Sequence, residues 1–114
     1  MKHVTYAEKS LLIGNEAADL LMEYAAAVSR VHSSDTVDLK AIGSDGNAVE
    51  ATFLLGVGAP LMVETASAEL NEPDNSGPIE YMMVRLRSLD SRAQVMAVDA
   101  SEFDEDDFGD FPKL

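Results

Sequence analysis

Hydrophobic and polar residues alternate over the first 13 positions in two short pieces. Val4 and Tyr6 form the first piece, Leu11 and Ile13 form the second, and the polar residues 8–10 separate them. A period of two is typical of a half-buried β-strand. The pattern therefore predicts a strand here, and leaves open whether it folds back as a small hairpin.

The pattern changes to helical spacing after Gly14. Apolar residues then recur at steps of three and four and form one stripe, namely Ala17, Leu20, Leu21, Tyr24, Ala27 and Val28. Asn15 precedes this stripe, and an Asn side chain is well suited to accept a hydrogen bond from an unpaired N–H of a first helical turn. We predict a helix over residues 16–30 with Asn15 as its N-cap.

Residues 36–57 carry the clearest hairpin signal in the chain. If Gly43 pairs with Asn47, Gly46 falls at the left-handed loop position that glycine adopts without steric cost. The same register predicts three pairs on one face and one on the other: Val37 with Phe53, Leu39 with Ala51, Ala41 with Val49, and Lys40 with Glu50. These pairings match apolar to apolar and cation to anion, so they predict strands over 36–42 and 48–57.

Residues 61–70 leave two alternatives open. Val63 and Thr65 alternate with their neighbours and favour a third strand over 61–66, whereas Ala66, Ala68 and Leu70 would suit a helix about as well. The next segment, 71–78, is rich in Asn, Pro and Gly and predicts a loop. A second helix is predicted over residues 78–89 from one apolar stripe, formed by Ile79, Met82, Met83, Leu86 and Leu89.

The predicted order is β-α-β-β-β-α, which indicates an α+β fold: a small antiparallel sheet with two helices packed on one face. We expect one domain over residues 1–92, followed by an acidic C-terminal tail over residues 93–114 that is flexible in solution. The piece formed by Ala93, Val95 and Ala97 leads into this tail.

This order resembles that of the ribosome hibernation factors, and its α-β-β-β-α part resembles the double-stranded-RNA-binding domain. The resemblance covers topology over residues 3–90 and no motif. Both families contact RNA through basic residues, whereas the second helix here begins Pro78, Ile79, Glu80, Tyr81. No residue role is carried over from either family.

Charge changes the picture of what the protein can bind. The chain has 114 residues with 21 acidic and 8 basic side chains, for a formal net charge of -13, and seven of the acidic residues lie in the last 22 positions. Such a chain repels nucleic-acid phosphates and anionic membrane surfaces, so we expect neither as a direct partner. The same field attracts and steers a basic protein.

Simpler observations exclude other classes of protein and other kinds of site. The N-terminus lacks the apolar run and cleavage site of a signal peptide, and no segment reaches the length of a membrane span, which predicts a cytoplasmic protein. The chain contains no cysteine, so disulfides and thiolate chemistry are excluded. His3 and His32 lie near element ends without a carboxylate at a telling spacing, and Gly56-Val57-Gly58 lacks the residues of a phosphate loop.

The tail combines carboxylates with aromatic rings. The residues that we expect to contact a partner are Phe103, Asp104, Glu105, Asp106, Asp107, Phe108, Asp110 and Phe111. The carboxylates would speed the encounter with a basic groove, and the phenyl rings would fill apolar pockets. In composition alone this segment resembles the acidic, Phe-bearing tails of single-stranded-DNA-binding proteins. The alternative is a solubilising tail whose Phe residues fold back on the sheet.

We therefore expect a small, non-enzymatic interaction module without cofactor or metal, which docks a basic partner through this tail. The first alternative is a nucleic-acid mimic that occupies a basic cleft through the body, with Glu16, Asp19 and Glu23. The second is a small-ligand binder or enzyme that uses the open sheet face, with Lys40, Glu50 and Thr52. An uncovered face bearing Ile42 and Leu54 also allows two copies to pair.

Overall fold

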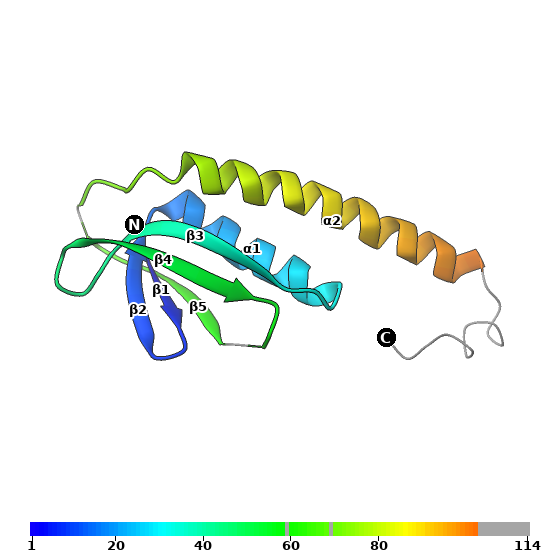
Figure 1. Ribbon diagram of the computed structural model, residues 1–114, viewed down its shortest axis with the longest axis horizontal. Helices are drawn as coiled ribbons and strands as arrows, with labels where there is room; N and C mark the ends of the chain where they lie inside the picture. Colours follow the sequence, from blue (N-terminus) through cyan, green and yellow to red (C-terminus); the bar gives the residue numbers. More distant parts are fainter. Residues whose placement is uncertain (59, 69, 103–114) are drawn as a thin grey trace.

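The computed structural model describes residues 1–58, 60–68 and 70–102. Its elements follow one another in the order β1 (Lys2–Tyr6), β2 (Lys9–Ile13), α1 (Asn15–Arg30), β3 (Asp35–Ile42), β4 (Ala48–Leu55), β5 (Leu61–Thr65) and α2 (Ser76–Glu102). The five strands form one antiparallel sheet in the order β4-β3-β2-β1-β5. Both helices lie on one side of it, with α2 running along α1 and past its end (Figure 1). The predicted α+β class and element order are confirmed.

The β3–β4 hairpin has the predicted register. Gly43 donates its N–H to the carbonyl of Asn47 across 2.9 Å, and Gly46 has a φ of +83°. The four cross-strand pairs are those expected from the sequence, including Lys40 opposite Glu50. The register is fixed locally, because the left-handed glycine and the alternation of apolar residues demand the same pairing.

The N-terminal residues and residues 61–65 also form strands. The first 13 residues fold back as the hairpin variant, in which Val4 pairs with Leu11. Segment 61–65 is strand β5, which pairs Val63 with Val4 along the other side of β1. This pairing settles the choice left open between strand and helix over residues 61–65.

Helix α2 is longer than the sequence indicated. It begins at Ser76 rather than Pro78 and continues to Glu102, well past the predicted end at Leu89. Residues 90–102 contain neither Gly nor Pro and are rich in alanine, so no residue breaks the helix there. The segment interpreted as an alternating piece and the start of a tail is therefore helical up to Glu102.

The core lies between the sheet and the two helices. Its buried members are Val4, Leu11, Ile13, Ala17, Ala18, Leu21, Tyr24, Ala27, Val28, Val37, Leu39, Ala41, Phe53, Leu55, Met82 and Leu89. The rings of Tyr6 and Phe53 meet edge-on, with centroids 5.8 Å apart, and connect β1 to β4 across the inner face. Met83 of the predicted α2 stripe is 41% exposed, whereas Met82 is fully buried.

The sheet opens between β2 and β3. These strands are joined by a single pair, Leu12 with Ile42, whereas β3 and β4 pair along eight residues each. The part of the β3 edge before Ile42 is consequently without a strand partner on the β2 side. The chain segment that leads into α2 reaches this gap, and the side chain of Asn75 bonds to the main chain of Lys40 there.

Candidate functional site

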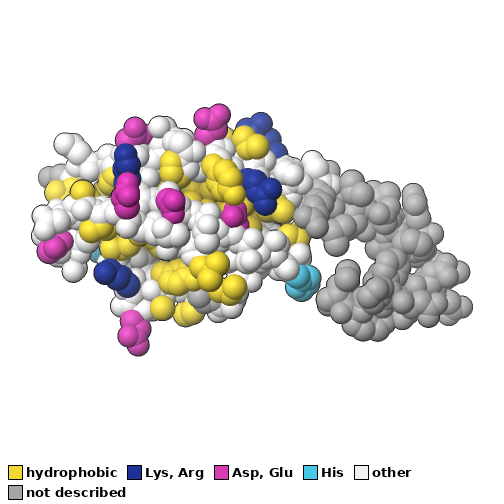
Figure 2. Space-filling view, in the orientation of Figure 1, with side chains coloured by type: hydrophobic (Ala, Val, Ile, Leu, Met, Phe, Trp, Pro, Cys, Tyr) yellow, Lys and Arg dark blue, Asp and Glu magenta, His cyan; other side chains and the backbone are white. Residues whose placement is uncertain are grey.

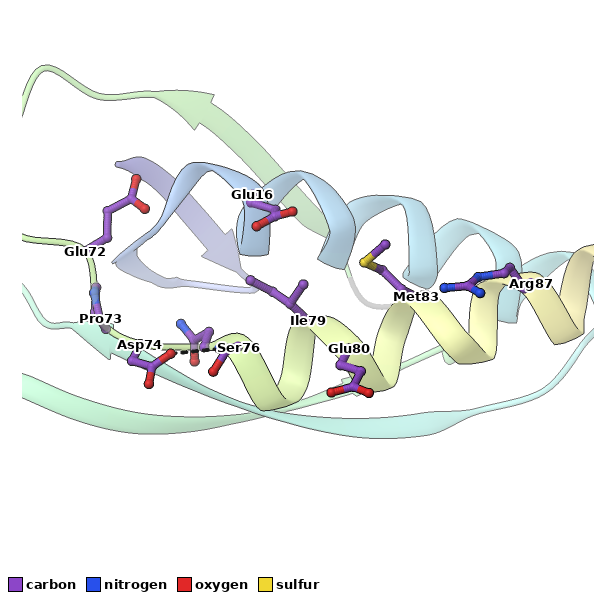
Figure 3. Close-up of a pocket in the computed structure, with 10 residues that line it drawn as sticks. Glu16, Glu72, Pro73, Asp74, Ser76, Ile79, Glu80, Met83 and Arg87 are labelled. Atoms are coloured by element: carbon purple, nitrogen blue, oxygen red, sulfur yellow. Dashed lines mark hydrogen bonds between the residues drawn. The ribbon is translucent and has the colours of Figure 1, made fainter.

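A groove runs between α1 and α2, and in the described part of the chain it is lined by charged side chains from both helices and from the loop before α2. It consists of three adjoining hollows, the first two of which share Glu16 and Met83, while the last two share Glu23. The first hollow is the largest, at about 490 Å³, and lies between the start of α1 and the first turns of α2. Figure 3 shows Glu16 from α1 and Ile79 and Met83 from α2 facing the space between the helices.

The periodicity of α1 places its carboxylates beside this groove. Leu21 and Tyr24 are buried on the inner face of the helix, so Glu16, Asp19 and Glu23 lie off that face. All three line the groove. The carboxylates that the sequence suggested for a nucleic-acid mimic are thus brought together along one rim.

The opposite rim adds further acidic groups. It is formed by the loop before α2 and by α2 itself, which contribute Glu72, Asp74, Glu80 and Asp90. The cations beside the groove include Arg30 and Arg87, while the ammonium of Lys2 contacts Asp19 at 2.6 Å and the N-terminal amine lies 3.7 Å from Glu72. Carboxylates therefore outnumber cations along the described length of the groove, which favours a positively charged occupant.

The floor between these rims is apolar. Ile79, Leu20 and Leu86 are half-buried there, and Met83 is exposed enough to contact a bound molecule. A methionine side chain is flexible and polarisable, so it adapts to different apolar groups. The groove can thus receive an apolar side chain at its base and cations at its edges.

The N-terminus of α1 is capped from a distance rather than by its own residue. Gly14 occupies the cap position without a side-chain hydrogen bond, so the predicted N-cap role of Asn15 is wrong. Instead the main-chain N–H of Asn15 donates to Oε1 of Glu72 across 3.2 Å, and the N-terminal amine lies 3.7 Å from the same oxygen. A carboxylate at this position also favours the positive end of the helix dipole.

A second polar cluster joins α1, β3 and α2. The hydroxyls of Tyr24 and Tyr81 both donate to Oδ2 of Asp35, and the guanidinium of Arg85 donates to the Tyr24 oxygen. Nothing in the spacing of these residues identified the cluster, because they lie on three elements that only the tertiary fold brings together.

The pKa values of this cluster follow from its geometry. Burial, aided by the neighbouring Asp35, raises the pKa of Tyr24 far above the ordinary phenol value. Burial alone would also raise the pKa of Asp35, but hydrogen bonds from Tyr24 and Tyr81 outweigh it and lower that pKa below 3.8. The cluster holds a charged carboxylate against two neutral phenols, an arrangement that ties three elements together and leaves Tyr24 without contact with solvent.

The outer sheet face bears a separate hollow, of about 420 Å³. The structure brings Lys40, Glu50 and Thr52 together there, as the small-ligand interpretation required, and adds the loop before α2. The Thr52 hydroxyl donates to Asp38 across 2.6 Å, so one of the polar groups in this hollow is already engaged.

The predicted partner-binding residues, from Phe103 to Phe111, lie outside the described residues, so their role stays a prediction. Among residues 1–58, 60–68 and 70–102, no three His, Asp or Glu side chains converge as metal ligands would. Over the same ranges no helix combines the length and apolarity needed to cross a membrane.

Comparisons with protein family models, with curated proteins and with solved structures gave no match to this chain.

Proposed function

We propose that this protein is an acidic, non-enzymatic interaction module that binds a basic segment of another protein. The observation that carries the proposal is the α1–α2 groove, in which an apolar floor lies between rims rich in carboxylates. This combination is typical of surfaces that receive an amphipathic segment with its apolar side down.

The expected occupant follows from the chemistry of the groove. Its apolar side chains would lie on Ile79 and Met83, and its Lys or Arg side chains would reach Glu16 and Glu23. Exposed ion pairs add little affinity on their own, so the apolar contacts supply binding while the charges supply steering and selection.

The acidic tail belongs to the same proposal as a second contact. Residues 103–111 follow directly on α2 in the chain and carry three Phe among further carboxylates. A partner seated in the groove would leave this segment free to engage a neighbouring basic surface, which raises the overall affinity by linking two weak contacts.

The nucleic-acid mimic uses the same carboxylates in the opposite geometry. A mimic inserts a convex row of charges into a cleft, whereas Glu16 and Glu23 border a hollow with an apolar floor. This shape supports a receiving surface rather than an inserted one.

The small-ligand alternative rests on the separate hollow at Lys40 and Thr52. It predicts that a metabolite raises the melting temperature and that basic peptides have no effect on it.

Two synthetic helical peptides of equal positive charge test the groove. In one peptide, Leu recurs at steps of three and four among Lys residues, so that one face of the helix is apolar, and in the other every Leu is replaced by Ser. We expect the full-length chain to bind the Lys/Leu peptide more tightly, and salt to weaken that binding. Equal binding of the two peptides, or binding unaffected by salt, would contradict the proposal.

Matched charge variants then locate the contact. The double variant Glu16→Gln with Glu23→Gln is expected to weaken Lys/Leu peptide binding about three- to tenfold. The control, Glu8→Gln with Glu64→Gln, removes the same charge from exposed positions on β1–β2 and β5 and should leave affinity unchanged. A chain ending at Glu102 separates the groove from the tail, because loss of binding there alone would assign the contact to the tail.

A further inference from the structure

Strand β4 is the outer strand of the sheet and offers a free edge. Gly43 and Asn47 form a hydrogen-bonded pair, and such pairs alternate along an antiparallel ladder. Val49 and Ala51 therefore bond to β3 through their main chain, whereas the N–H and C=O groups of Glu50 point away from it. Within the described ranges no strand pairs with this side of β4.

This edge lacks the features that usually prevent pairing. It contains no Pro and no Lys, its sole charge is Glu50, and its apolar residues Val49 and Leu54 are 38% and 46% exposed. Hydrophobic side chains gather in the region of β4 and β5 in Figure 2. The other outer strand, β5, has only five residues and carries the exposed Glu64 in its second half.

We propose that β4 pairs with β4 of a second copy of this chain, antiparallel and about a two-fold axis at Ala51. The edge is compatible with itself in this register. The outward-facing main-chain N–H and C=O groups of Glu50 meet the C=O and N–H groups of Thr52 in the second copy. The inner-face residues Val49 and Phe53 then lie opposite each other and extend the core across the junction.

The neighbouring registers are less favourable. An axis at Glu50 would place two carboxylates directly opposite each other. The Leu54 carbonyl already accepts a hydrogen bond from the Tyr6 hydroxyl across 2.5 Å. An axis at Thr52 leaves one hydrogen-bonded pair, Thr52 with Thr52, before Leu54 is needed, whereas an axis at Ala51 leaves two, both between Glu50 and Thr52. Ala51 is consequently the axis that pairs the outward-facing hydrogen-bonding groups, keeps the two Glu50 carboxylates from lying directly opposite each other, and uses the most unoccupied main chain.

The net charge of the chain predicts how salt affects this dimer. Each copy carries a net charge of -13, so two copies repel each other until salt screens them. Self-association should therefore strengthen with ionic strength, whereas the binding of a basic segment in the groove weakens. The opposite signs distinguish a failure of this proposal from a failure of the proposed function.

Sedimentation of the full chain at low and high NaCl tests the pairing. We expect a monomer–dimer equilibrium that shifts toward dimer at high salt. Val49→Lys, which places a charge on the inner side of the edge, should weaken the dimer by at least about tenfold. Met62→Lys makes the same charge change on β5, at a position that is 50% exposed, and should leave the dimer intact. A chain that stays monomeric at every salt concentration, or a dimer that ignores Val49→Lys, overturns the proposal.

Two single-cysteine variants test the register independently of Val49→Lys. The chain has no cysteine, so Ala51→Cys introduces a single thiol at the proposed axis, where the two Cα atoms of a non-hydrogen-bonded pair fall within disulfide range. With oxidised glutathione we expect a disulfide-linked dimer of Ala51→Cys and none of Val49→Cys. The reverse result, or equal crosslinking of both, overturns the register.

Discussion

The carboxamide of Asn75 bonds to the main chain of Lys40 as a neighbouring strand would. Its Oδ1 accepts the Lys40 N–H at 2.7 Å, and its Nδ2 donates to the Lys40 carbonyl at 2.9 Å. Asn75 is 3% exposed and also accepts the first main-chain bond of α2, from the N–H of Ile79. One residue thereby closes the gap left by β2 and anchors the start of α2.

Replacing Asn75 should destabilise the whole fold. Asn75→Ala leaves a part-buried N–H and carbonyl of Lys40 without partners, which we expect to lower the free energy of unfolding by about 2–3 kcal/mol. Asn75→Asp keeps the shape but loses the donor and places a charge beside a carbonyl, so it should cost a similar amount. Urea denaturation measures both. The control is Asn71→Ala in the same loop, at an exposed position, and a loss as large for Asn71 would contradict the role given to Asn75.

Gly56 and Gly58 provide a matched pair of backbone tests. Both have positive φ, of +89° and +80°, but a Cβ on Gly56 would lie 2.2 Å from the Ser33 carbonyl oxygen, whereas a Cβ on Gly58 meets nothing within 4 Å. Gly58→Ala should cost only the left-handed strain of about 1 kcal/mol. Gly56→Ala adds a main-chain clash and should cost about 3 kcal/mol or more. Equal thermal stability of the two variants would show that Gly56 does not approach Ser33 so closely.

Acid stability should depend on Asp35. Its pKa is lowered in the fold, so the stability it contributes is complete above the ordinary value of 3.8 and is lost as pH falls through the lower folded value. Asp35→Asn should reduce stability by about 1–2 kcal/mol at neutral pH, because the phenols of Tyr24 and Tyr81 then donate to a neutral acceptor. The difference between the two proteins should shrink below about pH 4. A difference that stays constant down to pH 2 would contradict this assignment.

Alkaline stability should depend on Tyr24. Its pKa is raised in the fold, so its stabilisation is complete below the ordinary phenol value of 10.0 and is lost as pH rises through the higher folded value. The wild-type chain should lose stability above pH 10, and Tyr24→Phe should lose less over the same interval. Tyrosinate absorbance at alkaline pH gives an independent readout, since Tyr24 should ionise only as the protein unfolds. An ionisation of every tyrosine before unfolding would overturn the prediction.

Much of the fold follows from local patterns. The register of the β3–β4 hairpin was predicted to the residue because Gly46 and the alternation around it agree on one pairing, although β4 ends at Leu55 and not at the predicted Val57. The end of α2 was predicted too early, because Ala93, Val95 and Ala97 resemble an alternating segment although no Gly or Pro breaks the helix there.

The sequence by itself determined the order of elements, the hairpin register, the acidic character and the apolar stripes of both helices. These properties depend on neighbours within a few residues, which the chain order supplies. Only the tertiary structure decided that Glu72 caps α1, that Asn75 joins β3, and that Asp35 meets Tyr24 and Tyr81. Those contacts join residues 11 to 57 positions apart, and no short-range periodicity encodes which polar groups meet when the helices pack on the sheet.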